Sequence, residues 1–384
     1  MSTAGTQREL TVAVLGAGGT IAPAVIRDLA ESDEVAALRL LDVDERRAAA
    51  AAREHGGGRA QARAADARIG LEAELRGCDV LVNCASYRVN LEAMQACRAA
   101  RCHYIDRGGL YWLTGRQLEL HEEFERAGRL ALLGMGSSPG KTNVMAVAAV
   151  RRLQAPVERL DVMAAGRDLD PPAGPSYPYA VQTLVDELTL RPVVVEGGNP
   201  TEVEPLSDGG SVDFGEPIGA APTIHTLHSE LRTFPESFGC REASFRLSLA
   251  PAVLERVREL ASAPPERVAA AAAEASPPSS GTLSVHVIDA YSGGTRVRVR
   301  AVTEPVPEWG LGGGVVSTGA PAAAAVRLLA RGRIEARGAL PPERCVQPED
   351  LFPELERRGT RFEVTIETDG IRLGASSGSS VGAT

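Results

Sequence analysis

Apolar and polar positions alternate along the first third of the chain in segments whose lengths suit strands and helices in turn. Residues 9–17 alternate and then become continuously apolar, as in a buried parallel strand, and helical periodicity follows over 21–30. Further strands are predicted at 37–44, 78–86, 102–109 and 129–136, and further helices at 45–55, 70–76, 90–101 and 117–128. This order predicts an α/β fold with a Rossmann-type, doubly wound parallel sheet.

The pattern changes after Pro139, where long polar or Gly/Pro stretches separate the predicted elements. The elements expected there are a helix at 141–154, strands at 157–166, 193–196, 243–249, 281–290 and 295–303, and helices at 250–275 and 317–334. They predict a second, α+β domain with a mixed or antiparallel sheet.

These patterns divide the chain into a first domain at 1–137 and a second domain at 138–316. A segment at about 317–366 is expected to return to the first domain. The Gly/Ser-rich end, 374–384, is expected to be disordered.

The chain has 384 residues and a net charge of −9, and no basic stripe suggests a nucleic-acid partner. No apolar run reaches about 18 residues and the N-terminus lacks a signal-peptide pattern, so we expect no membrane span and a cytoplasmic location. The six cysteines form no Cys-x-x-Cys pair and lack zinc-ligand spacing, so we expect reduced thiols and no metal site.

A glycine-rich turn follows the first predicted strand. Gly16 permits a tight turn, and Gly18 lets a pyrophosphate approach the N-terminus of the next helix. The third glycine of the usual dinucleotide fingerprint is replaced by Ile21. The expected cofactor contacts are Gly16, Ala17, Gly18, Gly19, Thr20, Ile21, Asp42, Asp66, Asn83, Cys84, Ala85, Ser86 and Gly136.

Asp42 ends the second predicted strand, where a carboxylate binds the adenosine ribose hydroxyls and repels a 2′-phosphate. This position favours NAD over NADP. Arg46 and Arg47 weaken that preference, but a solvated helix face is the favoured interpretation of both residues.

The stretch "LLGMGSSPGKTN", 132–143, combines three glycines with a Ser-Ser-Pro-Gly turn. We expect this turn to pass beneath the nicotinamide. The N–H groups at Thr142 and Asn143 would then hold a substrate carboxylate at the start of a helix. A simple interdomain turn is the alternative.

The motifs H-Y-I-D, G-M-G-S-S-P-G and T-L-H-S-E occur together with similar segments at 176–198, 226–238 and 317–334. With these motifs the chain resembles lysine 6-dehydrogenases of the saccharopine dehydrogenase family. The resemblance implies NAD(P)-linked chemistry at a carbon–nitrogen bond, and a second domain for substrate binding and homodimer formation. Arg107 and Lys141 stand where relatives commonly have apolar residues, which would suit a substrate more negative than lysine. Contact with solvent or with a carboxylate is the alternative for both.

Oxidation of an amine needs a base, because nitrogen must present its lone pair as hydride leaves the carbon. His228 is the first candidate, since histidine titrates near neutrality. If 223–230 forms a strand, His225 lies on the opposite face and Glu230 on the same face as His228. Glu230 would then bind a substrate ammonium. The expected catalytic residues are His228, Asp106 and Lys141.

Substrate contacts are expected from the loop after the fourth predicted strand and from the second domain. Arg88 has the planar fork that matches a carboxylate, and Arg232 competes for that role. Asp186 and Glu187 are adjacent on a predicted helix, so at most one of them is expected to face the site. The expected substrate-binding residues are Tyr87, Arg88, Arg107, Asn143, Tyr179, Glu230 and Arg232.

The leading interpretation is an NAD-dependent oxidative deamination, with L-lysine at its 6-amino group as the expected substrate and a semialdehyde that can cyclise as the product. One alternative is a saccharopine- or carboxynorspermidine-type reductase that joins an amine and an aldehyde with NAD(P)H. Another is a nucleotide-binding protein without turnover.

Overall fold

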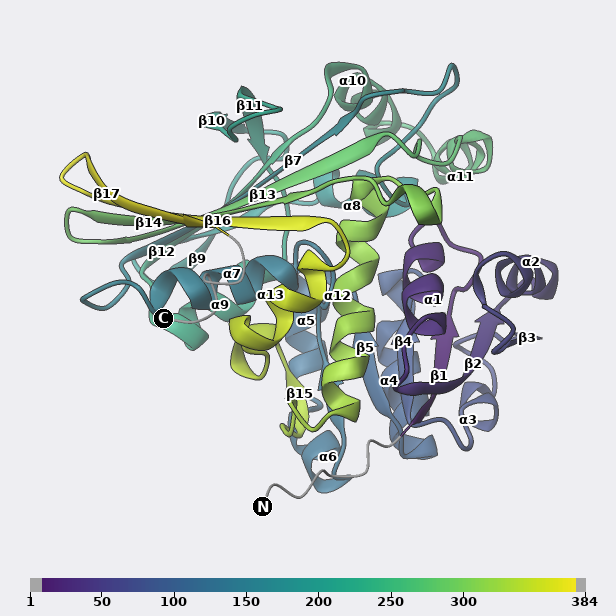
Figure 1. The fold of residues 1–384 in the computed structure, drawn as a ribbon. Helices are drawn as coiled ribbons and strands as arrows, with labels where there is room; N and C mark the ends of the chain where they lie inside the picture. Colours follow the sequence, from purple (N-terminus) through teal and green to yellow (C-terminus); the bar gives the residue numbers. More distant parts are fainter. Residues whose placement is uncertain (1–8, 378–384) are drawn as a thin grey trace.

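Within residues 9–377, which the computed structural model describes, the first sheet has seven parallel strands (Figure 1). Their order is β15-β6-β5-β4-β1-β2-β3. The strands are β1 (Leu10–Leu15), β2 (Val35–Asp42), β3 (Ala60–Ala64), β4 (Val80–Asn83), β5 (His103–Asp106), β6 (Leu130–Leu132) and β15 (Gly338–Leu340). The expected Rossmann-type parallel sheet is therefore confirmed.

Strand β1 lies between β2 and β4, so the strand order reverses there. In register, Leu15 pairs with Asn83 and Asn83 pairs with Asp106. The carboxyl ends of β1, β4 and β5 consequently meet at one edge of the sheet. Ligands of open α/β sheets bind at this edge, next to the reversal.

Helices cover both faces of the first sheet, because successive strand residues point to opposite faces. Val12 and Val14 of β1 share a core with α1 (Ala22–Ala30), α2 (Glu45–His55) and α12 (Gly313–Ala330). The opposite face packs on α3 (Leu71–Glu74), α4 (Asn90–Ala100) and α6 (His121–Arg126). The 3₁₀ turn η1 (Tyr87–Val89) and the helix α5 (Leu110–Leu118) follow β4 and β5.

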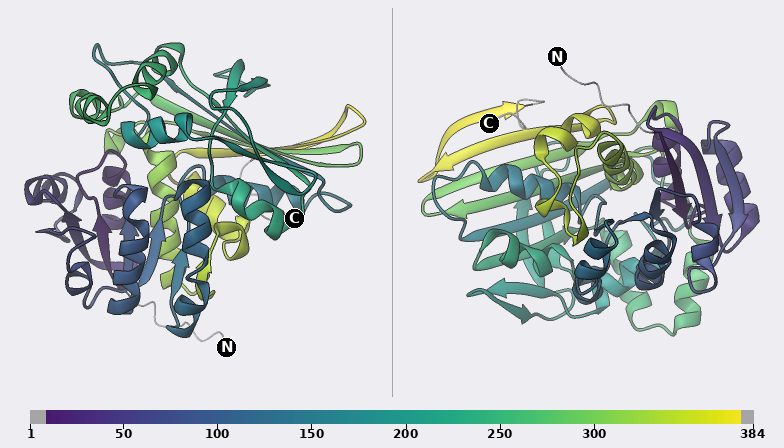
Figure 2. Two further views of the ribbon diagram at one scale, coloured as in Figure 1. Left: turned by 180° about the vertical axis from the view of Figure 1, so that it is seen from behind. Right: turned by 90° about the horizontal axis from the view of Figure 1, so that it is seen from below.

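The second sheet has ten strands in the described part of the chain and extends away from the first (Figure 2). Strand β7 is parallel to β12 and antiparallel to β13, so the sheet is mixed, as expected. The strands are β7 (Arg159–Asp168), β8 (Val193–Glu196), β9 (Asn199–Glu202), β10 (Asp208–Asp213), β11 (Ala220–His225), β12 (Glu242–Ser248), β13 (Thr282–Ser292), β14 (Thr295–Thr303), β16 (Thr360–Thr368) and β17 (Ile371–Ser377).

Two groups of helices pack on this second sheet. α7 (Lys141–Val150), α9 (Glu230–Phe238) and α13 (Pro348–Glu356) cover the face that carries Val162 and Ile288. A separate core joins α8 (Val181–Thr189), α10 (Pro251–Ala261) and α11 (Pro265–Glu274). The 3₁₀ turns η2 (Pro307–Trp309) and η3 (Pro342–Arg344) lie in the connections of the last third.

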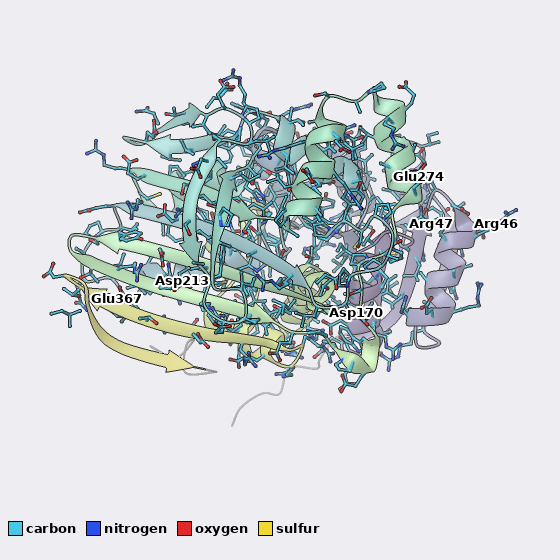
Figure 3. The ribbon with its side chains drawn as sticks, turned by 90° about the horizontal axis from the view of Figure 1, so that it is seen from above. Arg46, Arg47, Asp170, Asp213, Glu274 and Glu367 are labelled. Carbon is cyan, nitrogen blue, oxygen red and sulfur yellow. The ribbon has the colours of Figure 1, made fainter. Side chains whose placement is uncertain are left out.

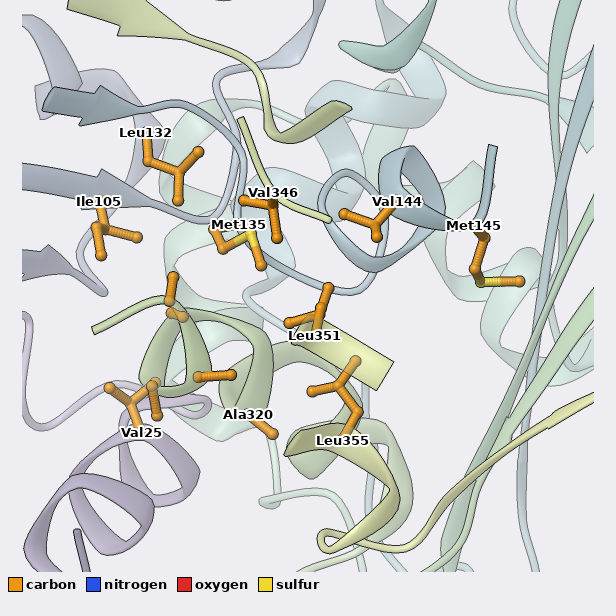
Figure 4. Packing of buried hydrophobic residues seen from close by; sticks show 14 of the residues in the cluster. Val25, Ile105, Leu132, Met135, Val144, Met145, Ala320, Val346, Leu351 and Leu355 are labelled. Atoms are coloured by element: carbon orange, nitrogen blue, oxygen red, sulfur yellow. The ribbon is translucent and has the colours of Figure 1, made fainter. Parts of the chain in front are cut away.

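The C-terminal part of the chain belongs to both sheets. Helix α12 packs closely on α1, since a Cβ added to Gly319 would lie 2.7 Å from the Cβ of Ala24. β15 pairs with β6 in the first sheet, whereas β16, which the expected returning segment includes, pairs with β14 in the second. Figure 4 shows residues of α12 and α13 packed beside Leu132 and Val144, so one core joins the two sheets.

By length and composition, α12 is the one helix among the described residues that is apolar enough to cross a bilayer. Of its apolar window, 78% is buried inside the protein. Its contacts with α1 and α13 account for that composition.

Three expectations need correction. The helix expected at 117–128 is two helices, α5 and α6, and α5 already begins at Leu110. The helix expected at 250–275 is two helices: α10 ends at Ala261 and α11 begins at Pro265, because Pro264 and Pro265 have no N–H to donate to the preceding turn. Of the expected disordered tail, residues 374–377 belong to β17, and 378–384 lie outside the described residues.

Candidate active site at the junction of the two sheets

The turn after β1 is built around Gly16, whose φ of +74° is a left-handed conformation. A Cβ on Gly16 would lie 2.5 Å from the backbone nitrogen of Ala85, at the end of β4. One on Gly18 would lie 2.6 Å from the Cβ of Arg47. Helix α1 then begins after Ile21 with no side-chain cap. This bare backbone before a helix N-terminus fits the pyrophosphate of a dinucleotide.

Asp42 lies beside this turn and is buried. Its Oδ2 accepts a hydrogen bond of 2.9 Å from the backbone N–H of Gly18, and Oδ1 accepts one of 3.0 Å from Asp44. The guanidinium of Arg47 donates to the Gly18 carbonyl oxygen. Arg47 is exposed, as the solvated-face interpretation expects, and this hydrogen bond places it beside the turn as well. Figure 3 shows Arg46 and Arg47 on α2 at the side of the first domain.

Two apolar residues near Asp42 were missed by the sequence reasoning. Val43 is 73% exposed and Ile69 is 76% exposed. Val43 follows strand β2, and Ile69 comes after the adjacent strand β3. Ile69 ends a turn in which the Asp66 side chain accepts from the N–H of Arg68. Exposed apolar side chains at the ends of two neighbouring strands suit the flat face of an adenine, which is expected at this edge of the sheet.

Asp106 was expected among the catalytic residues, but the fold uses its carboxylate. Its side chain is buried, and its Oδ1 accepts from the N–H groups of Gly108 and Gly134 at 2.8 and 2.7 Å. Its Oδ2 accepts from Gln117 at 2.6 Å and from Asn90 at 3.2 Å. Burial raises the pKa of Asp106, and these donors partly offset that effect. The carboxylate therefore joins two loops to α4 and α5, with no oxygen left to face a substrate.

The side chain of Asn83 is also occupied. Its Nδ2 donates to Asn90 at 2.9 Å and to the Tyr104 hydroxyl at 3.2 Å, and its Oδ1 accepts from the N–H of Ala85 at 3.0 Å. Ser86 caps η1 by accepting from the N–H of Arg88. The backbone here is used too: the Cys84 N–H donates to Leu15, the Cys84 carbonyl accepts from Arg107, and the Ala85 N–H donates to Asn83.

The glycines of the 134–143 turn serve the turn itself. A Cβ on Gly140 would lie 2.4 Å from the backbone of Gly136, and one on Gly134 would lie 2.8 Å from the ring of Pro139. The bare backbone thus lets the turn pack on itself, as in the simple-turn alternative.

At the start of α7, one of the two N–H groups expected to hold a substrate carboxylate is already used. The N–H groups of Lys141 and Thr142 donate to the carbonyls of Gly136 and Ser137. Asn143 accepts from the N–H of Gly140 at 2.7 Å and donates to Glu343 at 2.8 Å. Substrate binding by Asn143 is therefore contradicted, because both ends of its amide are used inside the fold.

Lys141, the one lysine of the chain, is fully buried. Its Nζ donates to Ser317 of α12 at 2.6 Å and to Thr303 of β14 at 3.1 Å. Burial lowers its pKa to about 7. The same amine, together with burial, depresses the pKa of His286. Lys141 thus lies between elements of the core, which contradicts a solvent-facing position, and its catalytic role stays a prediction.

Arg88 was expected to clamp a substrate carboxylate, but a carboxylate of the protein already holds it. Its Nη2 lies 2.9 and 2.7 Å from the two oxygens of Asp186 in α8. The Tyr87 hydroxyl donates to the same carboxylate at 2.6 Å. These contacts link the first domain to α8, and they contradict the clamp assigned to Arg88.

A buried acid–base cluster surrounds His228. Its Nδ1 lies 3.5 Å from Glu230 Oε2 and its Nε2 lies 3.9 Å from Glu187 Oε2. Its ring stacks on Phe245 with a centroid separation of 3.4 Å. The Tyr179 hydroxyl donates to Glu187. All three members of the Glu187–His228–Glu230 set are at most 7% exposed.

Carboxylates on both sides set the charge of this cluster. Burial lowers the pKa of His228, but Glu230 and Glu187 raise it by more, so the net shift is upward. Burial also raises the pKa of Glu230, and His228 together with Thr142 brings it below its ordinary value. The pKa of Glu187 is raised, mainly by burial. The two carboxylates therefore favour the imidazolium form of His228 more than water does.

The cluster is connected to the turn at the edge of the first sheet. Glu230 Oε1 accepts from Ser138 at 3.0 Å and from Thr142 at 2.9 Å. The structure thus brings Glu230 and His228 together, although the expected strand ends at His225 and Glu230 begins α9. His225 lines a different cavity, of about 400 Å³, together with Arg246.

Two further arginines were expected to bind substrate. Arg107 follows β5, and its Nη2 donates to the Cys84 carbonyl oxygen at 2.6 Å. Its buried Nε has no hydrogen-bond partner within the described residues. This cation therefore lies at the carboxyl edge of the sheet, beside Gly136. Arg232 of α9 lies against Gly115 of α5.

Residues 12–132 match the family model described as the saccharopine dehydrogenase NADP binding domain. The first domain is a nucleotide-binding domain. A solved structure of apo saccharopine dehydrogenase (L-Glu forming) from Saccharomyces cerevisiae covers 96% of this chain and 100% of that chain, with a TM-score of 0.66 and 14% identity. That likeness shows the same fold.

Two curated proteins match parts of the sequence. Carboxyaminopropylagmatine dehydrogenase of Synechocystis sp. is 26% identical over 196 residues, 48% of this chain and 48% of that protein. Carboxynorspermidine synthase of Vibrio alginolyticus is 33% identical over 95 residues, 22% of this chain and 23% of that protein. The chain spans about half the length, or less, of these curated relatives. The finer resemblance to lysine 6-dehydrogenase is not confirmed by them.

Proposed function

We propose that the protein is an NAD(P)-linked oxidoreductase acting on the carbon–nitrogen bond between an amine and a carboxylate-bearing carbon chain. The observation that carries this proposal is the contact of Ser138 and Thr142 with Glu230, which ties the acid–base cluster to the edge of the nucleotide-binding sheet. The names of both relatives describe an amine with a carboxylated alkyl group, which supports the same class of substrate.

In the reductive direction, the amine attacks the aldehyde, water leaves and an imine forms. When bound, the cofactor supplies the hydride that reduces the imine carbon. The protein must then deliver one proton to the nitrogen, and in reverse it must accept that proton. The Glu187–His228–Glu230 cluster holds such a proton away from water. Arg107 provides the charge that binds the substrate carboxylate.

The cofactor is proposed to be NAD, with NADP second. Asp42 at the end of β2 has the position that binds ribose hydroxyls and disfavours a 2′-phosphate. Arg47 places a cation beside the same residue, since it bonds the carbonyl of Gly18. The two side chains therefore act in opposite directions on cofactor choice.

Oxidative deamination of L-lysine at the 6-amino group is the second candidate. It is supported by the H-Y-I-D, G-M-G-S-S-P-G and T-L-H-S-E motifs, and by the carboxylates that would receive an ammonium near His228. The homodimer expected from the resemblance also stays a prediction, which light scattering of the purified protein tests.

Cofactor absorbance at 340 nm distinguishes these candidates. Purified protein is given NADH or NADPH with diamines and carboxylated aldehydes, and separately NAD or NADP with lysine and with N-carboxyalkyl amines. We expect oxidation of the reduced cofactor only when amine and aldehyde are both present. Release of ammonia from lysine would favour the second candidate. Cofactor binding without turnover on any pair would favour a nucleotide-binding protein and contradict the enzyme.

A further inference from the structure

The cluster around His228 leaves neither ring nitrogen facing open space. Glu230 lies on the Nδ1 side and Glu187 on the Nε2 side, while Phe245 covers one face of the ring. His286 is close enough on β13 for the two imidazoles to affect each other's charge. A substrate nitrogen cannot reach the imidazole directly in this arrangement. A proton must pass through a neighbouring side chain.

Tyr179 is the neighbour that can pass this proton. Its hydroxyl donates to Glu187 Oε2, the same oxygen that lies 3.9 Å from His228 Nε2. Unlike the three buried members of the cluster, Tyr179 is only partly buried. Its ring packs against the group formed by Ile21, Ala24 and Val315, next to the glycine-rich turn.

We propose that Tyr179 is the catalytic residue that exchanges a proton with the substrate nitrogen, and that Glu187 is the relay behind it. This inference rests on the proposed function. In the oxidative direction, the substrate N–H bond breaks and the proton binds Tyr179 Oη. The original phenolic proton moves to Glu187 Oε2, and the charge of His228 beside it favours the carboxylate form that accepts this proton. Hydride goes from the substrate carbon to NAD(P)⁺, and the reductive direction reverses each transfer.

The negative charge of Glu187 favours a proton relay through Tyr179 over a tyrosinate that acts as the base. Burial and the charge of Glu187 keep the pKa of Tyr179 well above its ordinary value, so the phenol stays protonated. A phenol that keeps its proton can still give one up while it accepts another. Glu230 lies on the Nδ1 side of His228, and Ser138 and Thr142 donate hydrogen bonds to its carboxylate. It is therefore a positioning residue.

The test compares Tyr179→Phe with Tyr177→Phe in the full chain. Tyr177 is a buried tyrosine two residues away, so it controls for loss of a hydroxyl in the same loop. We expect Tyr179→Phe to lower kcat about 100-fold or more, the usual range for a proton-transfer group. The dissociation constant of the cofactor should stay within about twofold, and Tyr177→Phe should stay within about threefold of the wild-type kcat.

The pH profile separates proton transfer from a structural role. Without Tyr179 the substrate amine must lose its proton to water, so the remaining oxidative rate should rise toward the amine pKa of about 10. Glu187→Gln interrupts the relay without removing Tyr179 and should give the same rise. If Tyr179→Phe does not fold, Glu187→Gln tests the relay in its place.

Different results overturn the two proposals. If the wild type is active and both Tyr179→Phe and Glu187→Gln keep kcat within about fivefold, the relay is wrong and the proposed function stands. If His228→Gln alone is inactive, His228 acts directly and Tyr179 is not the proton donor. If the wild type turns over no amine–aldehyde or amine substrate, the proposed function fails and the relay fails with it.

Discussion

Lys141→Met removes the one lysine of the chain from a fully buried position. Methionine has a similar length and no charge, so the core keeps its volume. The variant loses the hydrogen bonds from Nζ to Ser317 and Thr303. Thr303 keeps its contact with Thr360 at 2.9 Å, whereas Ser317 loses this donor. At a single pH, the loss of these hydrogen bonds lowers the stability of the variant, whereas the removal of a buried charge raises it.

The pH dependence of the unfolding free energy separates the effect of the Lys141 charge from that of the lost hydrogen bonds. Burial lowers the pKa of Lys141 from 10.5 to about 7. Between about pH 7 and pH 10.5, Lys141 is therefore protonated in the unfolded chain and neutral in the folded protein. Unfolding free energy should rise with pH across this window by about 1.4 kcal/mol per unit. Between about pH 7.5 and 9.5 the rise is about 2.5 kcal/mol, and below about pH 7 it levels off.

Urea unfolding of wild type and Lys141→Met at matched pH values measures this difference. Other titrating groups cancel in the comparison, including Cys78 and Cys240, whose pKa values are raised by burial to about 11. Selective ¹⁵N labelling of lysine adds a direct readout, because the chain gives one Nζ signal. Parallel stability curves, or an Nζ signal that titrates near 10, would refute the buried, neutral amine.

Three other substitutions test the candidate site. Gly16→Ala should abolish dinucleotide binding by calorimetry, because φ is +74° and the new Cβ meets Ala85 at 2.5 Å; unchanged affinity would contradict the cradle. Arg47→Ala should weaken NADP binding about tenfold or more and leave NAD within about twofold, and equal effects on both would remove its role in cofactor choice. Arg107→Leu should raise KM for the carboxylated substrate about tenfold or more at nearly constant kcat, and an unchanged KM would show that the carboxylate binds elsewhere.

Much of the fold could be predicted because local periodicity carries it. The strand β1 and the helix α2 appear close to the expected 9–17 and 45–55. Alternation with period two and the 3.6-residue repeat are set by backbone geometry, so they are visible without tertiary information. Helix α5 was missed, because no apolar stripe or cap marks its start at Leu110, which has a positive φ.

The candidate site, too, could be predicted from the sequence only in part. The glycine turn and Asp42 could be placed from sequence, because both adjoin predicted strands at the edge where nucleotides bind. Glu230 was expected near His228 on a strand, and it is near, but from the first turn of α9. Asp106 and Asn143 have residue types that suit a substrate, yet the fold uses their hydrogen-bonding groups for its own loops.

The sequence by itself determined the order of the elements, the parallel nucleotide-binding sheet and the glycine turn at its edge. Only the tertiary structure decided the partners of the charged side chains. Arg88 meets Asp186 across 98 residues, and Lys141 meets Ser317 across 176. The physical reason is that backbone geometry repeats over a few residues, whereas burial and ion pairing depend on which distant elements pack together.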